Sequence, residues 1–275
     1  MTPDTLPDNI PTVSVIIPVY NGERHLAETI ESVIAQKNVN WELIAVNDGS
    51  PDSSLSILEE YRKRMPDRIK VITVKNGGVS RARNTAVAAA RGTYIAFLDQ
   101  DDLWAPEKLQ LQVEMFTLDK KLGLSFTNAT VIDEKGSILR ENVLTYGEEN
   151  RGNVFEHLLF ENFIGISSVM LKRDVFVKSG RFDPRFSLAE DYDFLLKVTQ
   201  NTPVDYIDKP LLLYREHVQS GTHTKVSRLI DEALTICNDW KKLKPEIFRK
   251  NFIAYLKFRL KLEVLRLKMY IKNAG

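Results

Sequence analysis

The sequence predicts an α/β fold in which helices flank a doubly wound, mostly parallel sheet. Over the first hundred residues, short apolar segments alternate with segments of helical periodicity, the pattern of a parallel sheet with crossover helices. Three of the four apolar segments run directly into polar clusters, at Tyr20-Asn21, Asn47-Asp48-Gly49 and Asp99 to Asp102. Because ligands bind outside the carboxyl ends of the strands in such sheets, these clusters are expected to face one crevice.

The first half of the chain contains four expected strands, at 13–19, 41–46, 69–74 and 94–98. The first ends at the Tyr20-Asn-Gly22 turn and is followed by apolar residues at helical spacing, which predict a helix over 26–36. A second helix, capped by Asp52 or Ser53, precedes the third strand, and an alanine-rich helix over 82–90 precedes the fourth. The fourth strand is short, apolar and bounded by Gly92 and Pro106, as expected of a strand covered on both faces.

The second half is less regular. Its expected helices span 106–119, 174–178 and 187–198, and its expected strands span 122–132, a short return after the 133–136 turn, 166–171 and 211–217. Residues 141–152 are polar and are expected to form a loop.

Length and composition indicate one large domain with a helical appendage. The chain has 275 residues, 43% hydrophobic and 27% charged, which is ordinary for a globular protein. The single Cys237 excludes an intramolecular disulfide and fits a reducing compartment. Residues 1–11 are polar and proline-rich, so we expect a flexible N-terminus without a signal peptide. Since no apolar run reaches the roughly 18 residues that a membrane span requires, a cytoplasmic location is expected.

Three carboxylates follow the fourth strand, at Asp99, Asp101 and Asp102. Crowding anionic groups at one strand end is unfavourable unless a cation is close to them. Mg2+ or Mn2+ would be such a cation, since either binds one or two carboxylates and leaves room for phosphate oxygens. The alternative is a turn whose Asp residues cap the next helix and face water. The position at the mouth of a parallel strand favours the metal.

A nucleotide is the natural occupant of the predicted crevice. No G-x-G-x-x-G follows the first strand, which argues against a dinucleotide site, and the sequence holds no G-x-x-x-x-G-K-[ST] phosphate loop.

Six short motifs occur in a fixed order, and together they identify a resemblance. They are Pro18-Val-Tyr-Asn21, Val46-Asn-Asp-Gly-Ser50, Asn76-Gly-Gly with Ala82-Arg-Asn84, Phe97-Leu-Asp-Gln-Asp-Asp102, Glu190-Asp191 and Tyr214-Arg-Glu-His217. The set resembles the family 2 glycosyltransferases, which are inverting enzymes of the GT-A fold, over about residues 12–220. The resemblance implies a catalytic domain at 12–222, with a nucleotide-binding half at 12–104 and an acceptor half at 105–222. Residues 223–275 then form a basic helical extension.

The resemblance implies a role for each matching residue on the donor side. Pro18, Tyr20 and Asn21 would lie by the base, with the Tyr20 ring stacked on uracil, and Asp48 would accept from the base N3–H. Asn47 stands where the family often has a first Asp, a departure that leaves Asp48 intact. Arg83 matches a basic residue near the base or phosphate, and Asp99-Gln100-Asp101 matches the D-x-D motif. In that motif Asp99 faces the ribose, Gln100 lies at the nucleotide-sugar and Asp101 binds Mn2+ or Mg2+. His217 matches a group near the metal or diphosphate.

On the acceptor side, Asp191 of the Glu-Asp pair matches the family's general base. A carboxylate there would take the proton of the acceptor hydroxyl during an opposite-face attack, which inverts the anomeric centre. Two structural readings stay open: Asp191 could only complement the helix dipole, and Asp48 could only cap the Gly49-Ser50 turn. Trp104 and Tyr192 could line an acceptor pocket, but packing is the better expectation for both.

The function expected is metal-dependent transfer of a sugar from a nucleotide-sugar, with UDP as first choice, to the hydroxyl of a sugar or lipid-linked sugar. The family makes surface polysaccharides or glycolipids an expected setting. The alternatives are a sugar-nucleotide nucleotidyltransferase, which would usually show a glycine-rich basic loop after the first strand, and a nucleotide-sugar-binding protein without catalysis. Nucleic acid is not an expected partner, and an oligomer stays open.

Charge is distributed unevenly along the chain. Residues 225–275 hold 13 Lys/Arg and 5 Asp/Glu, a net +8, so the remainder holds 25 and 32, a net −7. A helix over 248–272 would place its lysines on one narrow stripe with apolar residues on both sides. The extension is therefore expected to pack partly on the domain and to present lysines to anionic lipid on the inner face of the plasma membrane. A helical hairpin that completes the fold, or a dimer contact, is the alternative.

Overall fold

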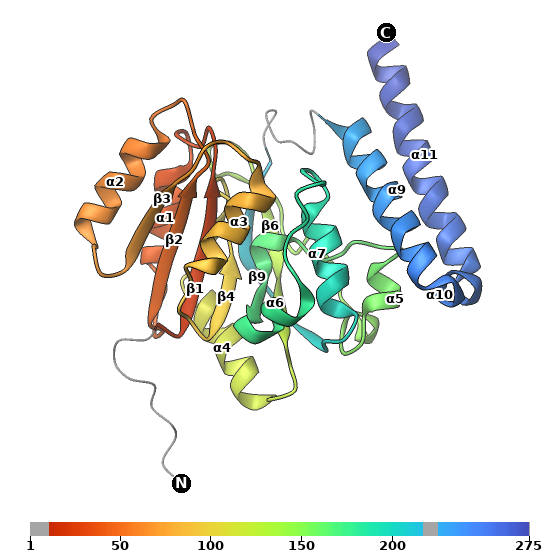
Figure 1. Cartoon of the computed structure of the whole chain (residues 1–275), viewed down its shortest axis with the longest axis horizontal. Helices are drawn as coiled ribbons and strands as arrows, with labels where there is room; N and C mark the ends of the chain where they lie inside the picture. The colour runs from red at the N-terminus through yellow and green to blue at the C-terminus, as the bar shows by residue number, and fades with distance from the viewer. Residues whose placement is uncertain (1–10, 217–224, 275) are drawn as a thin grey trace.

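A computed structural model describes residues 11–216 and 225–274 of the chain (Figure 1). Its strands are β1 Val13–Val19, β2 Trp41–Asn47, β3 Ile69–Thr73, β4 Tyr94–Phe97, β5 Leu103–Trp104, β6 Leu124–Ile132, β7 Ile138–Arg140, β8 Met170–Lys172 and β9 Val204–Arg215. Its α-helices are α1 Leu26–Ile34, α2 Ser54–Arg64, α3 Val79–Ala88, α4 Lys108–Leu118, α5 Phe155–Leu158, α6 Arg173–Ser179, α7 Glu190–Thr199, α9 Val226–Leu243, α10 Pro245–Lys250 and α11 Phe252–Ala274. Short 3-10 turns span Glu148–Asn150 and Ile166–Ser168.

One mixed sheet runs through the domain in the order β3-β2-β1-β4-β8-β6-β9-β5, and β7 pairs with β6. The first four strands are parallel, as predicted. The chain winds outward from β1 through β2 to β3 and then crosses back, so that β4 pairs with the other side of β1. This reversal is the topological switch point at which open α/β sheets bind ligands.

The second half of the sheet differs in detail from the prediction. The strand expected at 166–171 begins only at Met170, because Ile166–Ser168 forms a 3-10 turn that places the Ser167 hydroxyl against the N–H of Asp99. The strand expected at 211–217 begins earlier, at Val204. The preceding segment contains a proline and several charged residues, a pattern that predicts a loop. In the structure, Pro210 lies opposite Asn128 where the register between β6 and β9 shifts, and this shift lets the strand continue through the proline.

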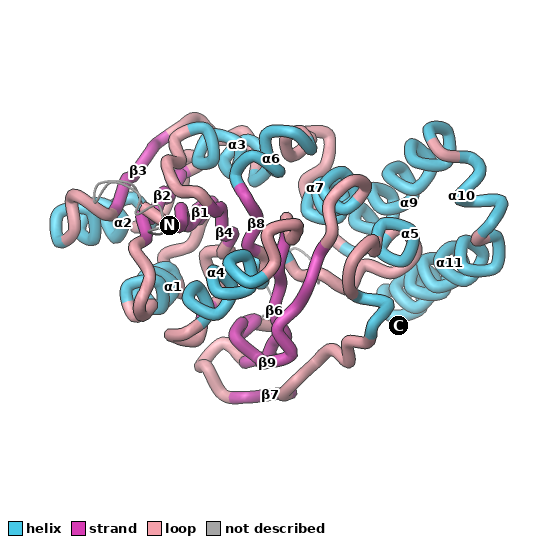
Figure 2. The backbone as a smooth tube through the Cα atoms, turned by 90° about the horizontal axis from the view of Figure 1, so that it is seen from below, coloured by secondary structure: helices cyan, strands magenta, loops and turns pink. Residues whose placement is uncertain are grey.

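Both faces of the sheet are buried, and successive residues of β1 belong to different cores. Val15 and Ile17 pack with α1, α2 and α4, whereas Ile16 packs with α3, α6 and α7. Figure 2 shows α1 and α4 on one side of the strands and α3 and α6 on the other. Burial on both faces explains why β1 and β2 are mostly apolar along their whole length.

The C-terminal helices are part of the fold. Ile236 and Trp240 of α9, Phe248 of α10 and Phe258 of α11 are buried in the same core as α7. Trp240 packs edge-on against Phe155 of α5, with 4.9 Å between ring centroids. The expectation that the extension packs on the domain is therefore met for these residues. The boundary expected at 222/223 lies outside the described residues.

Candidate active site

The ends of β1 and β4 are joined by one side chain. Gln100 accepts from the backbone N–H of Tyr20 through Oε1 (2.8 Å) and donates from Nε2 to the Tyr20 carbonyl (2.9 Å). This two-way bond fixes the backbone of Tyr20 while its ring stays 45% exposed, available to a planar ligand. Asn21 has a positive φ of 54°, which turns the chain sharply after β1.

Asp48 follows β2 and fixes the loop that leads into α3. Its Oδ1 accepts from the N–H of Gly77 and its Oδ2 from the N–H of Gly78, both at 2.8 Å. The residue is only 3% exposed, so these two bonds hold a buried carboxylate in place after the end of β2. A carboxylate has about four lone-pair sites, and these two bonds leave acceptor capacity for a further donor.

Arg83 on α3 links the two sides of the site. Its Nη2 donates to Oδ1 of Asp99 (2.6 Å) and its Nη1 to Oε1 of Glu190 (2.7 Å). The side chain is 2% exposed, and burial opposed by the attraction of Asp99 and Glu190 leaves the pKa of Arg83 above its ordinary value. Arg83 therefore ties the end of β4 to the start of α7.

Asp191 is the second residue of α7 and is partly buried. Its Oδ1 accepts from the N–H of Tyr192 at 2.7 Å. Burial and then the neighbouring Glu190 raise the pKa of Asp191 to about 7, against the opposing effect of Arg83. A carboxyl group with a pKa near neutrality can take up a proton and release it again at physiological pH.

Arg215, at the end of β9, anchors the acidic loop after β4. Its guanidinium donates from Nε to the carbonyl of Asp101 (2.9 Å) and from Nη2 to Oε2 of Glu28 (2.7 Å). Its backbone N–H donates to Oδ1 of the buried Asp102 (2.9 Å). Burial, followed by repulsion from Asp101 and Asp99, raises the pKa of Asp102. Asp102 therefore supports the loop from inside the fold. It is the one acid of the cluster to which the sequence assigns no role.

The donor set at this edge fits a hard divalent cation. Asp101 is partly exposed and Asp99 retains a 35% exposed side chain, so two carboxylates remain accessible after the end of β4. One or two carboxylates, completed by phosphate oxygens and water, is the usual arrangement for Mg2+. Within residues 11–216 and 225–274, no group of three or more His, Cys, Asp or Glu side chains forms a closed metal cage. His217, expected near the metal, lies outside the described residues.

The other expected residues have clear positions. Pro18 is buried within β1, so only its backbone can lie near a ligand. Trp104 is buried and donates from Nε1 to the Ser167 carbonyl, and Tyr192 is buried and donates to the Leu159 carbonyl. Packing is therefore confirmed for both aromatic side chains.

Two supporting residues could not be assigned from the sequence. The sequence identifies Glu190 only as the neighbour of Asp191. In the structure, Glu190 is the buried partner of Arg83. Arg215 lies inside the Tyr214-Arg-Glu-His217 motif, whose order was recognised, but nothing in the motif places Arg215 against the loop after β4. Both contacts join segments more than 100 positions apart, which local sequence pattern does not specify.

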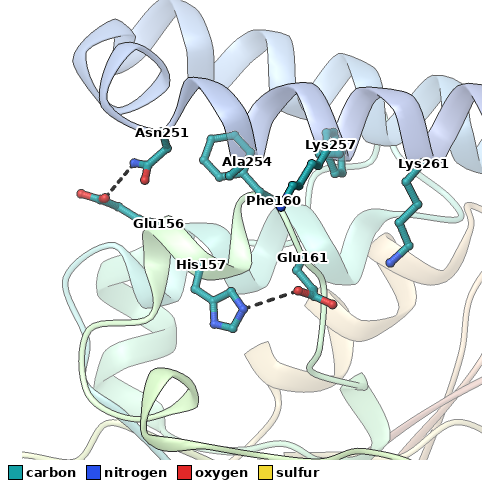
Figure 3. A pocket seen from close by; sticks show the side chains of 9 residues that line it. Glu156, His157, Phe160, Glu161, Asn251, Ala254, Lys257 and Lys261 are labelled. Atoms are coloured by element: carbon teal, nitrogen blue, oxygen red, sulfur yellow. Dashed lines mark hydrogen bonds and ion pairs between the residues drawn. The ribbon is translucent and has the colours of Figure 1, made fainter.

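A separate cavity of about 430 Å³ lies between α5 and α11. It is lined by Glu156, His157, Phe160, Glu161, Asn251, Ala254, Lys257, Phe258 and Lys261. In Figure 3 the acidic side chains are already paired, Glu156 with Asn251 and Glu161 with His157. None of the lining residues belongs to the strand ends, so this cavity is distinct from the site described above.

Comparison with known proteins agrees with the motifs. The profile described as Glycosyl transferase family 2 matches residues 14–175, more than half of the chain. An uncharacterized glycosyltransferase of Rickettsia felis is 31% identical over 88% of this chain and 40% of its own length. The uncharacterized glycosyltransferase EpsJ of Bacillus subtilis is 36% identical over 82% of this chain and 67% of its own. The putative teichuronic acid biosynthesis glycosyltransferase TuaG of Bacillus subtilis is 36% identical over 60% of this chain and 63% of its own. The chain thus spans less than half of the Rickettsia felis relative.

Solved structures show the same fold at low sequence identity. The mannosyltransferase PcManGT from Pyrobaculum calidifontis, in complex with GDP-Man and Mn2+, superposes with a TM-score of 0.66 at 20% identity, over 94% of this chain and 73% of that one. TarS 1-349 of S. aureus, in complex with UDP-GlcNAc, gives 0.65 at 20% identity, over 82% of this chain and 65% of that one. The profile match, the EpsJ relative and the GT-A architecture agree with the ordered motifs, and the chain belongs to glycosyl transferase family 2.

Proposed function

We propose that this protein transfers a sugar from a nucleotide-sugar to an acceptor hydroxyl with inversion at the anomeric carbon. The observation that carries the proposal is the Arg83 bridge, which holds Asp99 at the donor edge of the sheet next to Glu190 and Asp191. The two bonds of Arg83 therefore bring a carboxylate on the diphosphate side close to the pair of acids that contains the candidate base. This proximity is what a single displacement between donor and acceptor requires.

Asp191 would act as the general base. An acceptor hydroxyl is a poor nucleophile until a carboxylate removes its proton in the transition state. Of the two adjacent acids, Glu190 is bonded to Arg83, whereas Asp191 combines partial exposure with a pKa of about 7. Arg83 thus distinguishes the two: Glu190 serves as its counter-ion, and Asp191 is the group that can exchange a proton.

Asp101, with Asp99 beside it, would hold Mn2+ or Mg2+. When bound, such an ion supplies Lewis-acid stabilisation to the leaving diphosphate. Arg215 donates from its guanidinium to the Asp101 carbonyl and from its backbone N–H to the Asp102 carboxylate, so the loop that carries Asp101 is held in place before ligands arrive. Preorganisation of this kind lowers the cost of reaching the transition state.

UDP is the proposed nucleotide. The half-exposed Tyr20 ring offers a stacking surface, and the rigid Asp48 carboxylate retains acceptor capacity for the N3–H of uracil. TarS is described with UDP-GlcNAc and PcManGT with GDP-Man, so a GDP-sugar is the competing donor to be tested. The acceptor would be a sugar or lipid-linked sugar of a surface polysaccharide or glycolipid, in line with the teichuronic acid assignment of TuaG.

The outer face of α11 would bring the enzyme to a membrane surface. Ile253, Leu256, Leu260, Val264 and Leu267 are all exposed, with Ile253 at 70% and Leu260 at 65%, and their spacing places them on one face. Lys257 and Lys261, which also line the cavity against α5, lie along one edge of that face, and the exposed Leu265 lies beyond them. In the part of the chain that is described, no helix has the length and apolarity to span a bilayer.

An anionic lipid surface fits this face better than a second copy of the helix. An antiparallel twofold pair would set the lysine edge of each helix against the same edge of the other, which is repulsive. Anionic headgroups would instead attract the lysines while the apolar face enters the interface.

Liposome flotation of the double variant Ile253→Ser, Leu260→Ser tests this membrane contact, with Leu118→Ser as control because Leu118 is an exposed apolar residue on α4. Unchanged flotation of the double variant would refute the membrane contact. Point variants are preferable to deletion of 245–275, because that deletion removes the buried Phe248 and Phe258.

The catalytic proposal is tested by measuring nucleoside diphosphate release from a panel of UDP-, GDP- and dTDP-sugars with Mn2+ and oligosaccharide acceptors. Acceptor-dependent release of one nucleoside diphosphate, with inverted product by NMR, would support it. Turnover that instead requires pyrophosphate would indicate a nucleotidyltransferase, and donor binding without any turnover would indicate a non-catalytic binding protein. Either of these two results would overturn the proposal.

A further inference from the structure

The backbone leading into the proposed base is held by a carboxylate from the C-terminal helices. Oε2 of Glu232, on α9, accepts from three consecutive N–H groups, those of Ser187 (3.0 Å), Leu188 (2.9 Å) and Ala189 (3.0 Å). Its Oε1 accepts from the Ser187 hydroxyl at 3.2 Å. These three residues immediately precede Glu190 and Asp191 at the start of α7.

Glu232 binds donors at the entry to α7. The three N–H groups belong to the N-cap residue Ala189 and to the two residues before it, and the partial positive charge at the start of a helix favours a carboxylate there. Ala189, the residue at the N-cap of α7, provides no side-chain cap. Burial alone would raise the pKa of Glu232, but the donors at Leu188, Ser187 and Ala189 outweigh it and leave the pKa below its ordinary value. The ionised carboxylate is thus matched to these donors.

Glu232 is itself held on a fixed support. It is 8% exposed, and Arg228 one turn earlier donates from Nε to Glu232 Oε1 at 3.0 Å. Ile236 and Trp240 of the same helix are buried in the domain core. The position of the carboxylate is therefore set by the packing of α9.

The other side of the same segment is held by α3. The Ser80 hydroxyl donates to the carbonyls of Asp183 and Phe186, and Asn84 exchanges two hydrogen bonds with the backbone of Phe182. Arg83 then bonds Glu190. The segment 182–190 is thus clamped between α3, within the part of the chain that matches the family profile, and α9, outside it.

We propose that Glu232 is a positioning residue for Asp191, and that the C-terminal helices complete the catalytic site through this carboxylate, which binds the backbone next to Asp191. The proposal rests on the proposed function, in which Asp191 receives the acceptor proton. Glu232 touches neither donor nor acceptor in this role. Its effect is to fix the direction in which α7 presents Asp191, so its loss should reduce turnover and leave donor binding intact.

The test compares Glu232→Ala, Glu232→Gln and, as matched control, Asp231→Asn in the full chain. Asp231 is the adjacent acid on α9 and pairs with Arg266 at the surface, so the control removes a negative charge without touching 187–189. Glu232→Gln keeps one acceptor oxygen that can face the three N–H groups. Steady-state kinetics with the active donor and hydrogen exchange at the amides of 187–189 are measured for each variant.

Glu232→Ala is expected to lower kcat about ten- to hundred-fold, since small misplacements of a catalytic group have effects of this size. The donor KM should stay within about two-fold, as for an interaction needed only in the transition state. Exchange at 187–189 should accelerate, Glu232→Gln should recover most of kcat, and Asp231→Asn should match the wild type.

A Glu232→Ala protein with near wild-type kcat, or with slow exchange at 187–189, would refute the positioning role. If Glu232→Ala does not fold, Glu232→Gln decides by the same two readouts: a normal kcat with protected amides supports the role, and a kcat loss with protected amides refutes it. A wild-type protein that turns over no nucleotide-sugar would refute the proposed function itself.

Discussion

Arg83 is a buried cation bonded to two carboxylates from different elements, Asp99 and Glu190. A buried ion pair need not add stability over an apolar replacement of the whole group, but removing one partner leaves a charge without compensation. The guanidinium is therefore the side chain on which the geometry of the site depends most. Its near neighbour Arg81 is exposed on the same helix and provides a matched comparison.

We predict that Arg83→Met lowers the free energy of unfolding by about 3–5 kcal/mol, because Glu190 is left buried without its partner. Arg81→Met should change it by less than about 0.5 kcal/mol, as for an ordinary surface substitution. Urea denaturation of the two variants measures the difference. Equal stabilities would mean that the Arg83 bridge does not hold the two sides of the site together.

The pH dependence of turnover should report Asp191. Burial and then Glu190 raise the pKa of Asp191 to about 7, so the carboxyl is largely protonated below that pH and largely ionised above it. Because a base acts only when ionised, kcat/KM should rise with pH and reach half its plateau near pH 7. The stability effect has the opposite sign: a carboxyl whose pKa is raised on folding destabilises the fold as it ionises, so stability falls as pH rises toward 7.

A pH–rate profile between about pH 5.5 and 8.5 measures this rise of kcat/KM with pH. The residual activity of Asp191→Asn should not show the rise. A wild-type profile that is flat down to pH 5.5 would assign the base to a different group.

At the scale of elements, the site depends on how closely the β1 and β4 ends approach. Gly22 has no Cβ, and an added one would lie 2.5 Å from Oε1 of Gln100, the atom that accepts from Tyr20. A larger residue at this position would therefore have to displace the Gln100 amide from Tyr20. The Tyr20-Asn-Gly22 sequence thus serves packing between strands as well as the turn itself.

Gly22→Ala should displace the Gln100 amide and release the Tyr20 backbone. We expect a loss of stability of about 1–3 kcal/mol, typical of overpacking, together with a higher donor KM because the Tyr20 ring loses its support. Gly165→Ala is the control, since an added Cβ at Gly165 would meet open space. Thermal unfolding and donor titration would separate the two variants, and an unchanged KM in Gly22→Ala would argue against Tyr20 as a base contact.

Elements defined by local pattern could be predicted from the sequence, and those defined by partners could not. The strands at 13–19 and 41–47 are mostly apolar and can be predicted to within a residue, because burial on both faces leaves a local signal. The start of β9 at Val204 was missed, since its segment contains Asp205, Asp208 and Pro210 and becomes a strand only by pairing with β6. The Ile166–Ser168 turn could not be predicted for a similar reason, because its conformation depends on the hydrogen bonds that Ser167 accepts from Asp99 and Trp104.

At the scale of the whole molecule, the start of α7 is held jointly by α3 of the domain and α9 of the C-terminal helices. The motifs locate acids after the strands and at the start of α7, but they do not indicate which of these acids face outward. Asp102 and Arg83 are internal, whereas Asp101 and Asp191 are partly exposed, and this division follows from the long-range contacts of Arg215 and Arg83. The contribution of α9 could not be predicted either, because Glu232 has no motif and reaches residues more than 40 positions earlier.

The central claim is that Asp191 is the base of a metal-dependent transfer for which the donor is held by the β1, β2 and β4 ends. The most direct test measures nucleoside diphosphate release and donor affinity for the wild type, Asp191→Asn and Asp101→Ala with the donor that the panel identifies. We predict that Asp191→Asn binds donor normally and loses about 10²–10⁴ in kcat, the usual contribution of a positioned base. Asp101→Ala should lose metal-dependent transfer altogether. An Asp191→Asn enzyme that retains near wild-type turnover would contradict the account.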